Sequence, residues 1–218
     1  MLSTLDLSFI RYTTTSEVLY SVTRPTMWTT IVVLVAVSVT NTAALSQCSK
    51  YPEIPKLLAS IGDCYKDGKP PVNLVGYNKE VTLNYISKDI LPANVSCVKG
   101  SQQPGKGLVD FFLSDGSQAH VTYKQQVNGN KIVEFDSSNI QYDIFPIRNE
   151  FCYSYYRCIV SEGVEGTGEP MLALYIKCDY QNDPRAKKEI DTFFRCAKKL
   201  NVHNLVKMTP CTCKSEKN

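Results

Sequence analysis

The strongest constraint on this chain is its set of nine cysteines, all of which follow residue 47. A cytosolic chain would use so many thiols mainly as metal ligands, but the sequence has no Cys-x-x-Cys pair and only two histidines. Disulfide bonds in a secreted protein are therefore the better interpretation, and no metal is expected. The odd number leaves one free thiol or one bond to another chain, and spacing does not reveal the pairing. The disulfide candidates are Cys48, Cys64, Cys97, Cys152, Cys158, Cys178, Cys196, Cys211 and Cys213.

A segment near the N-terminus has the features of a secretory signal peptide. Residues 31–39 form an apolar run too short to span a bilayer, and the small residues Ala44 and Ser46 offer a cleavage position just before Gln47. Residues 27–46 are therefore predicted to be removed, which leaves an extracellular protein with no membrane segment. Residues 1–26 are polar and unpatterned, and we interpret them as an extension ahead of a translation start at residue 27.

The mature chain, residues 47–218, has no low-complexity linker and no internal repeat, which predicts a single domain. Apolar residues at helical spacing predict a short helix over 52–61. A longer helix is predicted after Asp183, which can cap it, with Pro184 in its first position. Its apolar stripe runs over 190–200, and we interpret its basic residues as a solvated face.

Between the two helices the pattern changes to period two, which is typical of β-strands. Asn128-Gly129 lies between two alternating runs and indicates a two-residue hairpin. About eight short strands at regular spacing predict an antiparallel up-and-down barrel or a sandwich, and a closed barrel of this size has room for one small ligand. A last apolar run, 203–208, is either a short strand or an extended tail. The predicted strands cover residues 81–86, 95–98, 108–113, 119–125, 131–136, 140–147, 151–160 and 171–177.

Three segments resemble the lipocalins, in particular the salivary histamine-binding lipocalins of ticks. Residues 94–100 (Asn-Val-Ser-Cys-Val-Lys-Gly) are similar to an early strand of that family, 151–160 to a late strand that begins with a cysteine, and 172–180 to the strand after it. The resemblance covers roughly residues 47–213. It implies an all-β dominated fold, an eight-stranded antiparallel up-and-down barrel with a short N-terminal helix and one C-terminal helix packed on the outside.

The resemblance also implies a disulfide from Cys97 to Cys211 or Cys213, and a role in saliva. The protein would sequester a host mediator, either a biogenic amine such as histamine or serotonin or a lipid, and so dampen host defence. In the family a Glu-Leu-Trp strand helps to cage the amine, whereas this chain has Ala173 and Tyr175 at the Glu and Trp positions. An amine would lose its carboxylate there, and a buried cation without a partner costs several kcal/mol.

A ligand site inside such a barrel would use alternate residues of each strand, because successive side chains point to opposite faces. Val133 with Phe135 and Leu172 with Leu174 are among the pairs expected to face inward. The carboxylates on the strands each have an apolar neighbour and are expected to face away, although one of them, Asp136, is near enough to a strand end to close a mouth. These carboxylates are Asp110, Glu134, Asp136 and Asp143. The predicted ligand-binding residues are Phe111, Phe135, Asp136, Tyr142, Tyr153, Tyr155, Leu174 and Tyr175.

No enzyme signature is present, so neither catalytic residues nor a cofactor is expected. The glycine-rich segment 163–168 lacks the Lys-Ser/Thr of a phosphate loop, and there is no Gly-x-Ser-x-Gly elbow. The formal net charge of +3 is too small to argue for nucleic acid. Asn94 opens an Asn-x-Ser sequon, which predicts N-glycosylation in a secreted chain.

Two other functions fit the same sequence. The barrel can be filled by its own side chains, so that surface loops inhibit a host protein such as a complement or haemostasis factor. Alternatively, the chain is a different disulfide-rich β-module with a structural role. Local pairs such as Cys152–Cys158 and Cys48–Cys64 would favour that module, whereas a bond from Cys97 to the C-terminal cysteines would favour the lipocalin.

Overall fold

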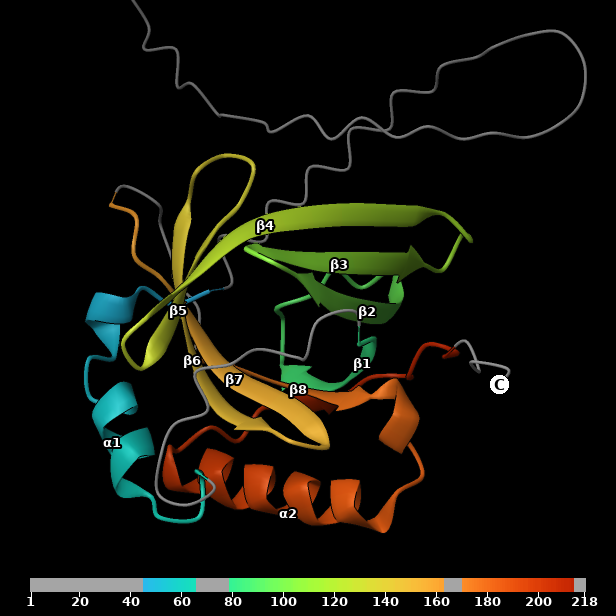
Figure 1. Ribbon diagram of the computed structural model, residues 1–218. Helices are drawn as coiled ribbons and strands as arrows, with labels where there is room; N and C mark the ends of the chain where they lie inside the picture. Colours follow the sequence, from blue (N-terminus) through green and yellow to red (C-terminus); the bar gives the residue numbers. More distant parts are fainter. Residues whose placement is uncertain (1–44, 66–78, 163–169, 214–218) are drawn as a thin grey trace, which may run out of the picture. The chain divides into compact units, whose positions relative to one another are not determined.

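The computed structural model describes residues 45–65, 79–162 and 170–213 (Figure 1). The predicted extension, nearly all of the predicted signal segment and the glycine-rich segment 163–168 lie outside these residues. The helices are the 3-10 turn η2 (Cys48–Lys50), α1 (Ile54–Ser60), the 3-10 turn η4 (Cys178–Tyr180) and α2 (Pro184–Lys199). The strands are β1 (Val81–Ser87), β2 (Val95–Gln103), β3 (Lys106–Leu113), β4 (Gln118–Asn128), β5 (Lys131–Phe135), β6 (Gln141–Asn149), β7 (Cys152–Ile159), β8 (Met171–Lys177) and β9 (Leu205–Lys207).

The strands form a closed barrel in which each of β1 to β7 pairs antiparallel with the next strand in sequence and β8 pairs antiparallel with β1. The order runs from β2 through β8 to β1, and β1 pairs back with β2, so that eight strands close the ring. This closure confirms the predicted up-and-down barrel. The closing seam is short, since the β1–β2 register joins only Val81 to Gly100 and Thr82 to Lys99. The far half of β1 pairs instead with β9, which confirms a short strand in the apolar run 203–208.

Two hydrophobic layers lie on opposite sides of the barrel wall. The inner layer fills the barrel and includes Leu83, Ile132 and Ile159. The outer layer lies between the wall and the helices, where Phe193 of α2 is fully buried in the same cluster as Leu174 of β8. α2 lies outside the barrel against β6, β7 and β8, as the sequence predicts for a C-terminal helix.

The long helix begins and packs as its sequence indicates. The Asp183 side chain accepts a hydrogen bond from the Arg185 backbone N–H at 2.8 Å, and Pro184 occupies the first helical position. Glu189 is buried on the inner face of the helix, and its Oε2 accepts the backbone N–H groups of Phe151 at 3.1 Å and Cys152 at 2.7 Å. This carboxylate therefore joins α2 to the start of β7.

Four disulfides join segments that are distant in sequence. Cys48–Cys158 ties η2 to β7, Cys64–Cys196 ties the end of the α1 segment to α2, and Cys97–Cys211 and Cys178–Cys213 anchor the C-terminal tail. The bond from Cys97 to Cys211 is one of the two that the lipocalin resemblance implies. The local pairs that would have favoured a different module do not occur.

Cys152 corrects the expectation that each cysteine is a disulfide candidate, because it is a free thiol. Its side chain is fully buried in the outer layer, and its Sγ lies 3.6 Å from the carbonyl oxygen of Ala186. Burial raises the pKa of the Cys152 thiol to about 12. The odd cysteine is thus enclosed within the fold, where it is not placed to bond a second chain.

The first described residues bear on where the mature chain begins. Leu45 is buried in the inner layer, and the carbonyl oxygen of Ser46 accepts a hydrogen bond from the Ile159 N–H at 3.0 Å. A chain that starts at Gln47, as the predicted cleavage implies, would lack both contacts.

Candidate ligand-binding site inside the barrel

A cavity lies within the barrel between two unlike walls. It is partly open to solvent and has a volume of about 60 Å³. One wall, from β2 and β3, carries Gly100 and Gly107, whereas the opposite wall carries tyrosines of β7 and β8. The rest of the lining has four apolar side chains and five that can form hydrogen bonds. The apolar ones are Val81, Leu108, Val109 and Ile144, and the polar ones are Ser101, Gln102, Tyr123, Gln125 and Glu134.

Three tyrosines on the β7–β8 wall form one cluster. The ring centroids of Tyr153 and Tyr155 are 5.1 Å apart, and that of Tyr175 lies 6.1 Å from Tyr155 and 6.3 Å from Tyr153. Burial raises the pKa of Tyr175 to about 12 and those of Tyr153 and Tyr155 well above their usual value. The phenols therefore remain neutral at physiological pH. They offer the cavity flat apolar faces with hydroxyl groups at the tips.

A buried ion pair lies beside these tyrosines. Arg157 Nη2 is 2.6 Å from Glu134 Oε1, and Gln125 Nε2 donates a hydrogen bond of 2.6 Å to Glu134 Oε2. Both charged side chains are nearly buried. Burial by itself lowers the pKa of Arg157, but the Glu134 carboxylate opposes this effect and the net shift is upward. Arg157 therefore stays charged, and its nearest charged partner is the Glu134 carboxylate.

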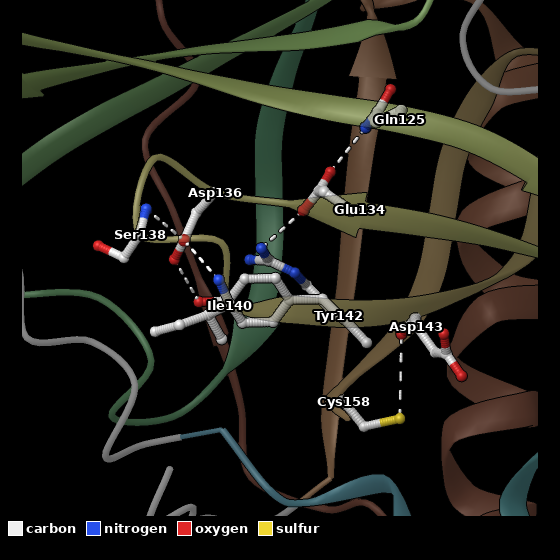
Figure 2. A network of polar contacts seen from close by, with 9 residues as sticks. Gln125, Glu134, Asp136, Ser138, Ile140, Tyr142, Asp143 and Cys158 are labelled. Atoms are coloured by element: carbon white, nitrogen blue, oxygen red, sulfur yellow. Dashed lines mark hydrogen bonds and ion pairs between the residues drawn. The ribbon is translucent and has the colours of Figure 1, made fainter. Parts of the chain in front are cut away.

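The guanidinium of Arg157 is also held by aromatic rings. Its Cζ lies 3.9 Å from the ring centroid of Tyr142 and 5.0 Å from that of Tyr123, which are cation–π distances. The Tyr142 hydroxyl donates to Asp136 Oδ2 at 2.9 Å. Figure 2 shows this network, in which the Gln125 and Glu134 side chains point toward one another. The polar group inside the barrel is thus ordered by contacts from four strands.

A glycine makes room for the network. A Cβ on Gly107 would lie 2.5 Å from Gln125 Nε2, closer than side-chain atoms approach. The missing side chain lets Gln125 turn toward Glu134. Gln125 Oε1 has no hydrogen-bond partner among the described residues, and the same is true of Arg157 Nε. Of these two residues Gln125 lines the cavity, so its Oε1 is an acceptor that the network leaves unused there.

The structure brings together some of the predicted site residues. Tyr153, Tyr155 and Tyr175 line the cavity, and Tyr142 lies beneath the Arg157 guanidinium. Phe111 packs on the inner layer without lining the cavity. Whether these residues bind a ligand remains a prediction.

On two strands, β5 and β8, the side chains that were predicted to face the barrel interior lie on the outer face instead. On β5, Ile132 and Glu134 face the interior, so Val133 and Phe135 lie on the outer face. On β8, Leu174 belongs to the outer layer with Leu172, because the inner positions are taken by Met171, Ala173 and Tyr175. Each strand is buried on both faces, so its apolar residues do not indicate which face is inside. The predictions of inward Phe135 and Leu174 are therefore wrong.

The four strand carboxylates also differ from one another. Glu134 lies inside, against the expectation that it faces away. Asp110 is paired with His120, with Oδ1 2.6 Å from Nδ1, and Asp143 is paired with Lys131. Asp136 follows β5, and its Oδ1 accepts the backbone N–H groups of Ser138 at 2.8 Å and Ile140 at 3.0 Å. It therefore holds a turn together and is tied to Tyr142.

Sequence reasoning missed Arg157, Glu134, Gln125 and Tyr123. For Arg157 a signal existed, since it follows Tyr155 by two residues and period two places it on the same face. Nothing in the local pattern distinguished the other three from solvated strand residues. Their positions depend on the register that sets Gln125 opposite Glu134.

Other features bear on what the described residues can hold. Within the described ranges, no three or more His, Cys, Asp or Glu side chains gather as metal ligands would. Neither α1 nor α2, nor any other helix in these ranges, has the length and apolar character to cross a bilayer. Asn94, the predicted glycosylation site, is exposed in the turn before β2.

Comparison with known proteins gives fold neighbours but no close relatives. No family model matches the chain, and no curated protein matches it. Among solved structures, lobster apocrustacyanin A1 is 13% identical with a TM-score of 0.48, covering 79% of this chain and 93% of its own. Japanin from Rhipicephalus appendiculatus, solved bound to cholesterol, is 13% identical with a TM-score of 0.41, covering 64% of this chain and 94% of its own.

A third neighbour is an LTBP1 variant solved in complex with leukotriene C4. It is 12% identical with a TM-score of 0.41, and the match covers 62% of this chain and 84% of its own. With identities and TM-scores this low, the barrel is established by its own strand pairings. In the residues that the structure describes, the chain is thus a closed eight-stranded antiparallel barrel with two α-helices.

Proposed function

We propose that this protein is a secreted carrier that binds one small amphipathic molecule inside its barrel. The observation that carries the proposal is the cavity itself, with a wall of neutral tyrosines, apolar side chains opposite and an ordered polar group. Such a lining suits a ligand with a flat or apolar body and a small hydrogen-bonding head. Four disulfides support an extracellular location, because such bonds persist in oxidising compartments.

Of the two ligand classes that the sequence suggests, the geometry favours the lipid-like one over the amine. Glu134 supplies a carboxylate within the barrel, but Arg157 already neutralises it at 2.6 Å. A protonated amine would have to share that carboxylate with a fixed guanidinium, and like charges repel strongly where water is excluded. A neutral head group meets no such penalty, and an acidic one meets repulsion only next to Glu134. Either can use the tyrosine hydroxyls, and a hydrogen-bond donor can use the unpaired Oε1 of Gln125.

In the organism, the proposed role is sequestration of a host lipid mediator, which dampens host defence by mass action. Binding alone is enough for this role, provided that the protein is abundant and release is slow. Asn94 is proposed to carry a glycan outside the barrel.

The test is a binding titration on the mature protein. Serotonin, histamine and a long-chain unsaturated fatty acid are titrated while tyrosine fluorescence is recorded, and native mass spectrometry counts bound molecules. We expect saturable binding of one fatty acid, weakened roughly tenfold by Tyr155→Ala, because the ring supplies much of one wall. The matched control is Tyr180→Ala, which removes a tyrosine that packs on Phe151 in the outer layer.

Two outcomes would contradict the proposal. Tight binding of serotonin with none of the fatty acid would assign the cavity to amines. A protein that remains empty with every probe would favour the alternative in which surface loops bind a host protein.

A further inference from the structure

The outer face of α2 is the most basic surface element among the described residues. Five cations are exposed along it, and they are Lys187, Lys188, Arg195, Lys198 and Lys199. Asp191 is the one exposed acidic residue of this helix. This single face therefore carries more positive charge than the formal net charge of +3 for the whole chain.

The lysines of this face are not engaged by the fold. No salt bridge among the described residues involves Lys187, Lys188, Lys198 or Lys199. Arg195 donates a hydrogen bond to Thr192 Oγ1 at 2.9 Å and lies 3.6 Å from Asp63, with both charged side chains at least half exposed. By contrast, Arg185 at the start of the helix is held by Asp183 at 2.7 Å. The fold therefore uses the first cation of the helix and leaves the later ones for solvent or a partner.

The cations lie on one side of the helix in two groups, Lys187 with Lys188 and Arg195 with Lys198 and Lys199, and Asp191 lies between the groups in the same sector. At 100° per residue their positions fall within about one third of the helix circumference, and the rise from Lys187 to Lys199 is about 18 Å. The helix is immobilised against the barrel by Phe193 and by the Cys64–Cys196 disulfide, so both groups are presented rigidly. Rigidly held cations on one side of a helix are complementary to an extended polyanion lying along it.

We infer that the outer face of α2 binds a linear sulfated polysaccharide of the extracellular surface. Concentrated positive charge along the helix favours a polymer with repeated anionic groups. Because the disulfides indicate an extracellular protein, the polymer it meets is one found outside the cell. This surface is separate from the barrel cavity and independent of the ligand proposed for it. Binding there would hold the carrier close to the tissue where its small ligand is released.

An anionic membrane is the competing partner, and the structure argues against it. Helices that lie in a membrane surface insert a continuous apolar face. The apolar face of α2 is already used, since Phe193, Cys196 and Ala197 are buried against the barrel. Phe194, with 38% of its surface exposed, is the one large apolar side chain that the helix offers to solvent.

The experiment compares two double substitutions that remove the same charge. Lys188→Gln with Lys199→Gln acts on the α2 face, and Lys106→Gln with Lys124→Gln removes two exposed lysines from the β3–β4 wall. Binding of the mature protein to a size-defined heparin fragment is measured by calorimetry in about 0.15 M salt, where distant charges are screened. Thermal unfolding verifies that each variant is folded.

We expect the wild type to bind heparin and the α2 double variant to bind roughly tenfold more weakly, because two contacting cations are lost. The β3–β4 double variant should bind like the wild type. Equal weakening in both variants would overturn the inference, because it would show attraction by net charge alone. Lack of wild-type binding would also overturn it, as would capture by phosphatidylserine vesicles that heparin does not displace.

Discussion

The inner and outer faces of the same wall are built for different purposes. On β7 and β8 the outer face carries Tyr156, Leu172 and Leu174, which pack in one apolar layer with α2. The inner face of the same strands carries a tyrosine cluster that lines the cavity, together with Arg157, which is paired with Glu134. Strand alternation thus separates the packed layer from the proposed ligand site within a few residues. The outer layer can be optimised for packing while the inner layer keeps polar groups and space.

The largest expected effect comes from the outer layer. Phe193→Ala removes a fully buried ring between α2 and the wall, and we expect it to lower the free energy of unfolding by about 3–5 kcal/mol. Tyr155→Phe on the inner face keeps the ring and should change stability little. Urea unfolding followed by circular dichroism measures both. A loss below about 1 kcal/mol for Phe193→Ala would contradict the division of roles, given the usual cost of such truncations.

The next effect concerns the buried ion pair. Glu134→Gln leaves the Arg157 guanidinium charged and without its carboxylate, which should cost about 3 kcal/mol of unfolding free energy. Combining it with Arg157→Met removes the isolated charge and should restore most of the loss. A double-mutant cycle on unfolding free energies measures the coupling. Simple additivity of the two single changes would show that the pair does not act as a unit.

A smaller effect tests the hydrogen bonds by which Glu189 joins α2 to the start of β7. Glu189→Ala removes the acceptor of two backbone N–H groups and should cost about 1–3 kcal/mol, whereas Glu189→Gln keeps an acceptor and should cost less. Burial raises the pKa of Glu189 above its usual 4.5, so the folded state holds the proton more tightly than the unfolded chain.

The sign of the pH dependence follows from that upward shift. The stabilisation that arises because folded Glu189 binds its proton more tightly is fully present below about pH 4.5. It is lost as pH rises through the folded-state pKa of Glu189. The stability of Glu189→Gln relative to the wild type should therefore increase from pH 4 toward pH 7. Chemical unfolding across this range measures it, and a difference that falls with pH would contradict the assignment.

The smallest effect is a chemical one with no change in stability. Burial that raises the pKa of Cys152 to about 12 keeps its thiol protonated, and the thiolate is the reactive form. Iodoacetamide should leave the folded protein unlabelled and add one group after denaturation without reductant. Mass spectrometry counts the groups. Labelling of the native protein, or a dimer that reductant dissolves, would show that Cys152 is accessible.

Much of the fold could be predicted because its signals are local. Asn128-Gly129 marks the β4–β5 turn, and Asp183 with Pro184 marks the start of α2, as observed. The lipocalin resemblance implied a bond from Cys97 to Cys211 or Cys213, and the structure has the bond to Cys211. The other three disulfides did not, because their partners are brought together by the barrel rather than by spacing.

The candidate site was predicted less well, for a reason visible in two strands. β5 and β8 are buried on both faces, so apolar residues occupy both phases of the alternation. β7 is also buried on both faces, yet its tyrosines were placed correctly, and its phase shows that Arg157 belongs with them. On β5 the prediction was wrong by one residue in the alternation, so that Glu134 faces the barrel interior where Phe135 was expected.

By itself, the sequence determined the strand-rich fold, the long C-terminal helix and the disulfide-bonded character of the chain, since these depend on neighbouring residues and on cysteine content. The tertiary structure alone decided which cysteine is free and that Glu134 meets Arg157 inside the barrel. Those outcomes depend on register between strands and on packing between distant segments. Neither the register nor the packing can be read from the local pattern of residues in the sequence.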